Sequence, residues 1–266
     1  AIASPPRVCA CLVSFGGFGP WLDAARRSAR RFRRPQRPIT APEEACPRYT
    51  PRMTSAAGLD LSDAKVVIQT LERAAELNTD SSLRKGAAVV LPDRGLLMTG
   101  DLHDHGLNLA RILKLAELEK NRHHHLVLHE LIHGPARING RDLSIRTLVR
   151  AAAVKVAFPK QVHFLQSNHE LSQIVGEGIL KGNISVVDSF NDGVEFLYPD
   201  DAEWVKAALA KYVRSLPLAV RCGNGVFCSH SLPSPRKIES FDKTVLDRVP
   251  TDEDLDVGGA AYTMVW

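Results

Sequence analysis

Long apolar runs are missing from this chain of 266 residues. No stretch approaches the ~20 apolar residues that a membrane-spanning helix needs, so we expect no membrane partner. Cysteines are few, and they show neither the spacing of a zinc site nor that of a disulfide framework; they are Cys9, Cys11, Cys46, Cys222 and Cys228. The absence of such a framework favours a reducing compartment, and cytoplasmic localisation is the prediction.

The chain also lacks an even distribution of basic residues, although its net charge is +4. Residues 1–52 hold ten Arg and three acids, whereas residues 53–266 hold 24 basic and 27 acidic residues. The second part therefore lacks the basic character of a nucleic-acid-binding surface, and we expect no nucleic-acid partner for it. Its length and the 44% apolar content of the chain suffice for one sizeable core.

The first part of the chain has a different composition. Residues 1–52 are rich in Arg and Pro and show no helical or strand period. Such a basic arm is typical of a transit peptide or of a nucleic-acid-binding extension. Alternatively it is no part of the mature protein, since Met53 is the first methionine and precedes a predicted amphipathic helix. In both cases we expect residues 1–52 to be disordered and residues 53–266 to form the folded domain.

Strand-like and helix-like segments alternate from residue 53 onwards. The expected strands are 86–92, 95–100, 124–129, 162–166, 218–222 and 225–230, and the last run, 260–266, is also strand-like. Apolar residues at helical spacing predict helices over 108–120, 141–158 and 201–216. This alternation predicts an α/β fold with helices on both faces of a sheet, in which functional groups gather beyond the carboxyl ends of the strands.

Four polar phrases follow these strands. They are GDLHDH at 100–105, HELIHGP at 129–135, SNHE at 167–170 and FCSH at 227–230. Their carboxylate, imidazole and amide groups are the ligands that hard or borderline divalent metals prefer, and no thiolate is needed. The sequence therefore predicts a metal site at this edge of the sheet.

In order and chemistry the four phrases resemble the calcineurin-like metallophosphoesterases, including the serine/threonine protein phosphatase branch, over residues 86–232. The motifs of that family are GDxHG, GDxxDRG, GNHE, a later His and a final Gly-His. The resemblance implies a four-layer α/β/β/α sandwich. It also implies hydrolysis of a phosphate ester by a hydroxide that bridges two divalent metal ions, with Mn, Fe, Zn and Ni all compatible.

The resemblance also implies residue roles. The metal ligands would be Asp101, His103, Glu130, Asn168 and His230, and the catalytic residue His169 would protonate the leaving alkoxide. The phosphorylated substrate stays open, because a phosphoprotein, a nucleotide and a small phosphoester all fit. No His follows His230, so we expect a sequence cut short before the final Gly-His of the family.

The second phrase departs from the family pattern. Glu130 stands where the family has an Asp that bridges both metals, and His133-Gly134 stands where it has Asp-Arg. These changes remove a phosphate-binding arginine and the usual partner of the catalytic acid. Arg137 or Arg141 would be a substitute, since a guanidinium group binds phosphate in a bidentate manner.

Two other functions stay open. Residues 129–133 form a literal HExxH, the zinc-protease motif, which needs a helix so that both His side chains face one zinc ion. The strand-like run before the motif and Gly134-Pro135 after it argue against such a helix. The changed second phrase instead favours, as the main alternative, a non-catalytic metal-binding module on the same fold.

Overall fold

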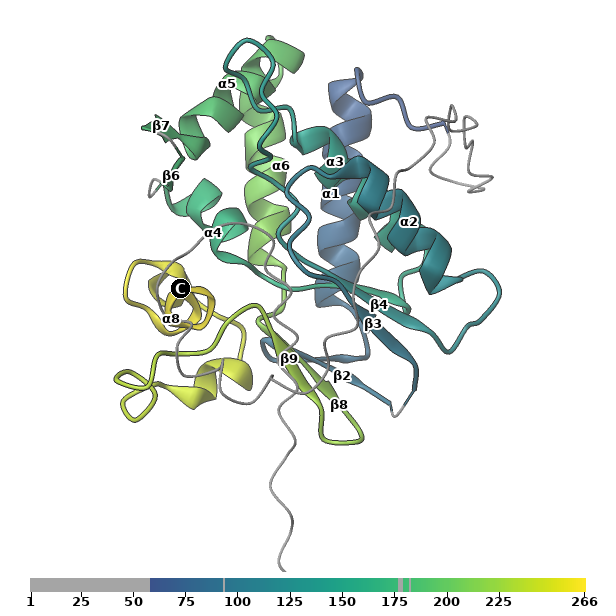
Figure 1. Ribbon diagram of the computed structural model, residues 1–266, viewed down its shortest axis with the longest axis vertical. Helices are drawn as coiled ribbons and strands as arrows, with labels where there is room; N and C mark the ends of the chain where they lie inside the picture. Colours follow the sequence, from purple (N-terminus) through teal and green to yellow (C-terminus); the bar gives the residue numbers. More distant parts are fainter. Residues whose placement is uncertain (1–57, 93, 177–178, 182) are drawn as a thin grey trace, which may run out of the picture.

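The computed structural model describes residues 58–92, 94–176, 179–181 and 183–266. Helices and strands occupy separate regions, with the longest helices above the strands in the view of Figure 1. The extension predicted over residues 1–52 lies outside the described residues. No described helix has both the length and the apolar character to cross a lipid bilayer.

Three helices form the main helical layer: α1 (Ala64–Thr79), α3 (Ile145–Ala157) and α6 (Ala202–Arg214). Helix α1 begins where the side chain of Asp63 accepts a hydrogen bond from the backbone N–H of Lys65 at 2.9 Å. Val67, Leu71 and Ala74 recur at helical spacing, are buried, and face α3 and α6. These three helices confirm the helix predicted after Met53 and those predicted over 141–158 and 201–216.

Two sheets carry the strands. One sheet is entirely parallel and has the order β3 (Leu96–Met98), β4 (His125–Leu128) and β5 (Val162–Phe164). The other has the order β1 (Arg84–Lys85), β2 (Ala88–Leu91), β8 (Ala219–Cys222) and β9 (Phe227–Ser229). A separate hairpin consists of β6 (Leu180–Lys181) and β7 (Ile184–Ser185).

Alternation along β4 explains how these layers stack. Leu126 and Leu128 belong to the cluster shared with the helical layer, whereas Val127 packs with Val89 and Val220 of the other sheet. The two sheets therefore bury their facing side chains against each other. The predicted α/β class is confirmed, while the complete four-layer sandwich stays a prediction.

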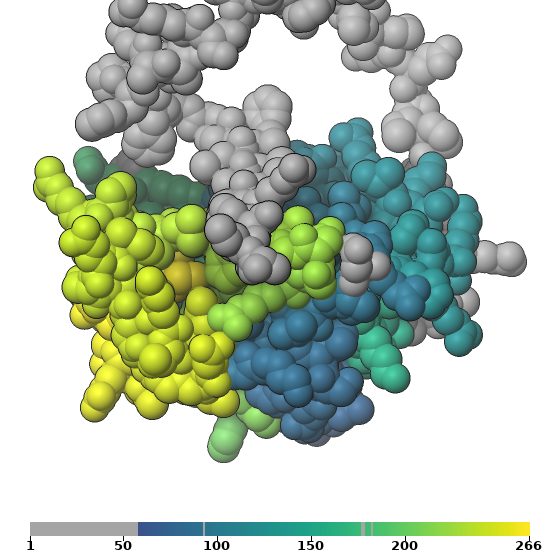
Figure 2. All heavy atoms as spheres, turned by 90° about the horizontal axis from the view of Figure 1, so that it is seen from below, coloured from purple at the N-terminus to yellow at the C-terminus, as the bar shows by residue number. Residues whose placement is uncertain are grey.

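The remaining helices of the described residues are α2 (Gly106–Ala116), α4 (Asn168–Val175), α5 (Val186–Leu197), the 3₁₀ helix η2 (Lys243–Leu246), α7 (Asp252–Leu255) and α8 (Ala260–Val265). The strand expected over 260–266 is wrong. Ala261, Met264 and Val265 are buried together, a helical rather than an alternating spacing. Figure 2 shows the part of the chain that precedes the C-terminus, in yellow-green, beside the blue segment with β1 and β2. The backbone N–H of Ala87 donates to the carbonyl oxygen of Leu246 at 3.1 Å.

A close backbone approach holds the loop that follows β4 against α5. The backbone N–H of Asp142 donates to the carbonyl oxygen of Ser189 at 2.9 Å, and the Cα of Gly193 faces the same loop. A Cβ at Gly193 would overlap the carbonyl oxygen of Asp142, so only glycine allows this contact.

We expect Gly193→Ala to lower the free energy of unfolding by about 2 kcal/mol or more, because the added methyl group overlaps backbone that cannot move aside freely. Urea unfolding monitored by circular dichroism measures this change. Gly106→Ala, also in a helix but with open space at its Cβ, is the matched control and should be neutral or mildly stabilising. Equal effects of both substitutions would contradict this account.

Candidate metal centre

The polar phrases meet at one edge of the parallel sheet. Because β3, β4 and β5 run in the same direction, the loops that follow them lie at a common end. Asp101 follows β3, Glu130 follows β4, and His169 lies in the first turn of α4, which follows β5. His230 arrives from β9 of the other sheet.

Candidate ligand atoms form two groups in the described part of the chain, each with its atoms within 4.8 Å of one another. We call them the first ligand group, Asp101, His129, Glu130 and His230, and the second ligand group, His103, Glu130 and His169. Glu130 belongs to both. A carboxylate with two oxygens suits a position between two cations.

Backbone hydrogen bonds join the loops that carry these side chains. The carbonyl oxygen of Glu130 accepts from the N–H groups of Leu102 at 2.9 Å and His103 at 2.8 Å. Glu130 itself has φ 53° and His103 has φ 40°, both in the left-handed region. Non-glycine residues adopt this region at a cost, and they cluster at functional sites.

A second buried carboxylate fixes the same loop from the other side. Glu170 Oε1 accepts from the backbone N–H of Leu131 at 2.7 Å and of Ile132 at 3.4 Å. Ser167 Oγ donates to the other carboxylate oxygen of Glu170. The last residue of SNHE therefore anchors α4 to the loop of Glu130, a role that the sequence analysis did not assign.

The hydrogen bond of His103 orients its ring for metal binding. Its Nδ1 lies 2.9 Å from the carbonyl oxygen of Ile132, which can only accept, so Nδ1 carries the proton. The lone pair of Nε2 then faces Glu130, whose Oε1 is 3.9 Å away. Metal-binding histidines typically donate their other N–H group to a carbonyl or a carboxylate in this way.

A chain of hydrogen bonds likewise orients His169. Gln173 Nε2 donates to Asn191 Oδ1 at 2.9 Å, which leaves Gln173 Oε1 to accept from His133 Nε2 at 2.8 Å. His133 Nδ1 therefore accepts from His169 Nδ1 at 2.8 Å. The remaining nitrogen of His169, Nε2, lies 3.7 Å from Glu130 Oε1.

Known proteins provide an independent comparison. No model of a protein family matches the chain. A curated protein of Encephalitozoon cuniculi, named a probable serine/threonine-protein phosphatase, is 25% identical over 150 residues, which are 56% of this chain and 29% of that protein. A solved Saccharomyces cerevisiae serine/threonine phosphatase, described as similar to human phosphatase PP5, superposes with a TM-score of 0.55 at 17% identity, over 77% of this chain and 58% of that one.

The resemblance to the calcineurin-like metallophosphoesterases is confirmed. The structural likeness at this identity concerns the fold. The chain spans 29% of the curated relative and 58% of the solved phosphatase.

Five of the predicted site residues lie in the two ligand groups, namely Asp101, His103, Glu130, His169 and His230. Asn168, the remaining predicted metal ligand, directly precedes His169 in the sequence. Its Oδ1 atom is buried and has no hydrogen-bond partner, a costly state that a cation would relieve. The donor set thus fits a divalent metal, while each residue's role as ligand or acid stays a prediction.

The electrostatics of the centre favour a cation. Burial raises the pKa of Glu130 to about 10, and the adjacent Asp101 carboxyl, hydrogen-bonded to it, adds to the shift. Burial lowers the pKa of His230 to about 4 and that of His169 to about 2, and neighbouring cationic or imidazole groups contribute. Near pH 7 the imidazoles are therefore neutral and Glu130 holds a proton that a metal ion would displace.

The two predicted phosphate-binding arginines lie in different surroundings. The Arg141 guanidinium lies over the Phe196 ring, 4.8 Å from its centroid. Arg137 is close enough to His133 to help lower the pKa of that imidazole, after burial and other neighbours. Neither placement tests a role in phosphate binding, which stays a prediction for both.

Lys181 is a cation near the centre that the sequence analysis missed. Its Nζ donates to the carbonyl oxygen of His133 at 3.3 Å. It also lowers the pKa of His103 and His169, although burial has the larger effect on both. Lys181 lies in the hairpin of β6 and β7, outside all four motifs, so no sequence signal marks it.

The HExxH segment does not form a zinc-protease helix. Residues 129–133 are not helical, and Glu130 and His133 have φ values of 53° and 59°. His129 contacts His230, whereas His133 contacts His169 and Gln173. The two histidines of the motif thus have separate partners and do not share a ligand group.

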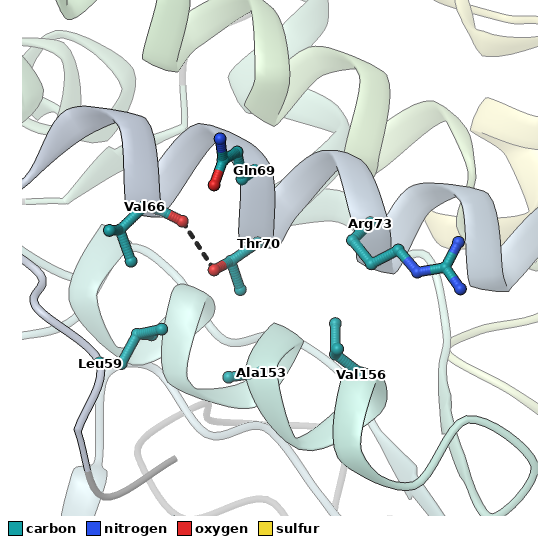
Figure 3. A pocket seen from close by; sticks show the side chains of 7 residues that line it. All are labelled: Leu59, Val66, Gln69, Thr70, Arg73, Ala153 and Val156. Atoms are coloured by element: carbon teal, nitrogen blue, oxygen red, sulfur yellow. Dashed lines mark hydrogen bonds between the residues drawn. The ribbon is translucent and has the colours of Figure 1, made fainter. Parts of the chain in front are cut away.

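A pocket lies elsewhere, between α1 and α3 (Figure 3). Its walls are Leu59, Val66, Gln69, Thr70, Arg73, Ala153 and Val156. Thr70 Oγ1 donates to the Val66 carbonyl oxygen at 2.7 Å within α1, so the hydroxyl is already bonded to its own helix. This pocket shares no residue with the ligand groups.

We expect metal binding to release about one proton per chain near pH 7, because Glu130, with a pKa of about 10, must ionise while the imidazoles are already neutral. Affinity for Mn²⁺ should consequently rise about tenfold per pH unit below that value. Calorimetric titration in buffers of different ionisation enthalpy counts the protons. Glu130→Gln is the control that removes this source, and a count near zero for the unmodified chain would contradict the electrostatic account.

Proposed function

We propose that this chain is a metal-dependent phosphoesterase that hydrolyses phosphate esters. The observation that carries the proposal is the pair of ligand groups that share the buried carboxylate of Glu130. Two divalent cations held there would neutralise phosphoryl oxygens and lower the pKa of the attacking water. The phosphatase names of the similar proteins support the same reaction class.

The residues have distinct tasks in this proposal. Asp101, His103, Glu130, Asn168 and His230 hold the cations. Lys181 attracts the anionic ester, since its ammonium group donates to the carbonyl oxygen of His133 and interacts electrostatically with Glu130 and Asp101. A phosphorylated serine or threonine of a protein is the substrate class favoured by the names of the similar proteins, while nucleotides and small phosphoesters also fit.

His169 has two possible tasks, and its hydrogen bonds define them. His133 accepts the Nδ1 proton of His169, so Nε2 faces the centre. Once Nε2 takes up a proton, His169 is the general acid for the leaving group. The surroundings oppose that proton, because burial first, and then His103 and His133, lower the pKa to about 2. A neutral Nε2 would instead bind a cation beside His103.

The proposed function is tested by hydrolysis of p-nitrophenyl phosphate by the full chain in Mn²⁺, with Asp101→Asn as control. Metal-dependent turnover that is lost in the variant supports the phosphoesterase. A folded chain that binds Mn²⁺ without turnover on this monoester or on a diester such as bis-p-nitrophenyl phosphate overturns it in favour of a non-catalytic metal-binding module.

We expect Asp101→Asn and His169→Ala each to reduce kcat by about 10²-fold or more. With His169 as the general acid, only Asp101→Asn should lower the bound metal, because Asp101 supplies a carboxylate ligand whereas the acid does not bind the ion. Metal content after desalting, measured by plasma mass spectrometry, separates the two roles. Equal metal loss in both variants would make His169 a ligand.

For Lys181 we expect Lys181→Met to raise KM for p-nitrophenyl phosphate about fivefold or more and Lys181→Arg to keep most of the affinity, because a retained cation still attracts the phosphate. Lys160→Met is the matched control. Lys160 is exposed and precedes β5, so it lies at the amino-terminal end of the parallel strands, whereas the centre lies at their carboxyl-terminal end. Equal KM values in Lys181→Met and Lys160→Met would contradict a role in substrate binding.

A further inference from the structure

His129 lies at the carboxyl end of β4, and neither the strand pattern nor the family resemblance assigns it a role. In the family phrase GDxxDRG, to which HELIHGP corresponds, its position is a glycine without a side chain. Here the side chain is 6% exposed. A buried polar ring needs partners, and the structure shows them at both nitrogens.

One nitrogen of His129 is bonded to the backbone. Nε2 lies 2.9 Å from the carbonyl oxygen of Thr99, which can only accept, so Nε2 carries the proton of the neutral ring. Nδ1 is then left with its lone pair. This is the arrangement in which a histidine is oriented by a backbone carbonyl and binds metal through its other nitrogen, as found for His103.

The lone pair of Nδ1 lies among the other donors of the first ligand group. Nδ1 is 3.2 Å from His230 Nδ1 and 3.8 Å from Asp101 Oδ1. A tetrahedral ion with bonds of about 2.1 Å holds its donors about 3.4 Å apart. The four ligand atoms, all within 4.8 Å of one another, therefore need only a modest contraction to surround an ion.

We propose that His129 binds a divalent cation through Nδ1, together with the other three members of the first ligand group. The inference rests on the proposed metal-dependent function and adds one ligand to it. With two imidazoles and two carboxylates, the site favours borderline transition ions such as Zn²⁺, Co²⁺ and Ni²⁺ over Mg²⁺ and Ca²⁺, which prefer oxygen ligands.

A purely structural role for His129 makes different predictions. A proton on His230 Nδ1 would satisfy the lone pair of His129 without any ion, and His129 would then only orient His230. In that case a side chain at position 129 never contacts the metal. A direct spectroscopic signature of contact therefore separates ligation from orientation.

The test uses Co²⁺ as the probe with the full chain. In His129→Cys a thiolate at the metal gives a sulfur-to-cobalt charge-transfer band in the near ultraviolet, which we expect above the background of the unmodified chain. His125→Cys is the matched control, because His125, the first residue of β4, is also a buried histidine and lies outside both ligand groups. In parallel, His129→Gln should weaken Co²⁺ binding about tenfold or more, and His125→Gln should not.

Each outcome decides a different point. One outcome overturns the ligand role and leaves the proposed function intact: the unmodified chain binds Co²⁺, His129→Cys shows no new band, and His129→Gln binds with unchanged affinity. Absence of Co²⁺ and Mn²⁺ binding by the unmodified chain overturns both. Circular dichroism in EDTA verifies folding. If His129→Cys does not fold, the visible d–d spectrum of Co²⁺ bound to His129→Gln replaces it, since loss of a nitrogen ligand changes this spectrum and an unchanged spectrum overturns the ligand role.

Discussion

The buried carboxylate of Glu130 is the constraint on which the rest of the centre depends. A charge without a partner is costly to bury, and this side chain is 4% exposed beside the Asp101 carboxyl. The backbone keeps it there, because the carbonyl of Glu130 accepts from two N–H groups of the loop after β3. Moving Glu130 into solvent would therefore disrupt both loops, so the carboxylate has to be neutralised in place, by a proton or by a cation.

Glu170 and Glu130 are both buried carboxylates, but their surroundings differ. Burial raises the pKa of both groups, but for Glu170 the donors Ser167, Leu131 and Ile132 work against that shift. Glu170 is thus satisfied within the protein and holds α4 against the loop. Around Glu130 the neighbours are mainly neutral imidazole nitrogens and another carboxyl. A metal ion between these groups would compensate the charge of an ionised Glu130 carboxylate.

Much of this arrangement could be predicted from local patterns. Strand runs followed by Asp, Glu, Asn and His predicted the sheet edge and five members of the ligand groups, because parallel strands bring the ends of separate motifs together. The anchoring by Glu170 and the position of Lys181 depend on contacts between segments that are distant in sequence. They also depend on left-handed backbone at Glu130 and His133, which no glycine in the sequence indicates. The C-terminal helix α8 was missed because a short apolar run fits either period.

The second phrase, in which the family's Gly-Asp-x-x-Asp-Arg-Gly becomes His-Glu-Leu-Ile-His-Gly-Pro, changes the centre in a consistent direction. The two histidines of the phrase, on either side of the left-handed residue Glu130, have different partners. His129 contacts His230, and His133 contacts His169. Both imidazoles are buried and have contacts at both ring nitrogens, so both are integrated into the packing of the centre. With His129 as the proposed ligand, the first ligand group gains an imidazole where the family has a glycine, and this nitrogen donor shifts preference from hard oxygen-seeking ions toward borderline transition metals.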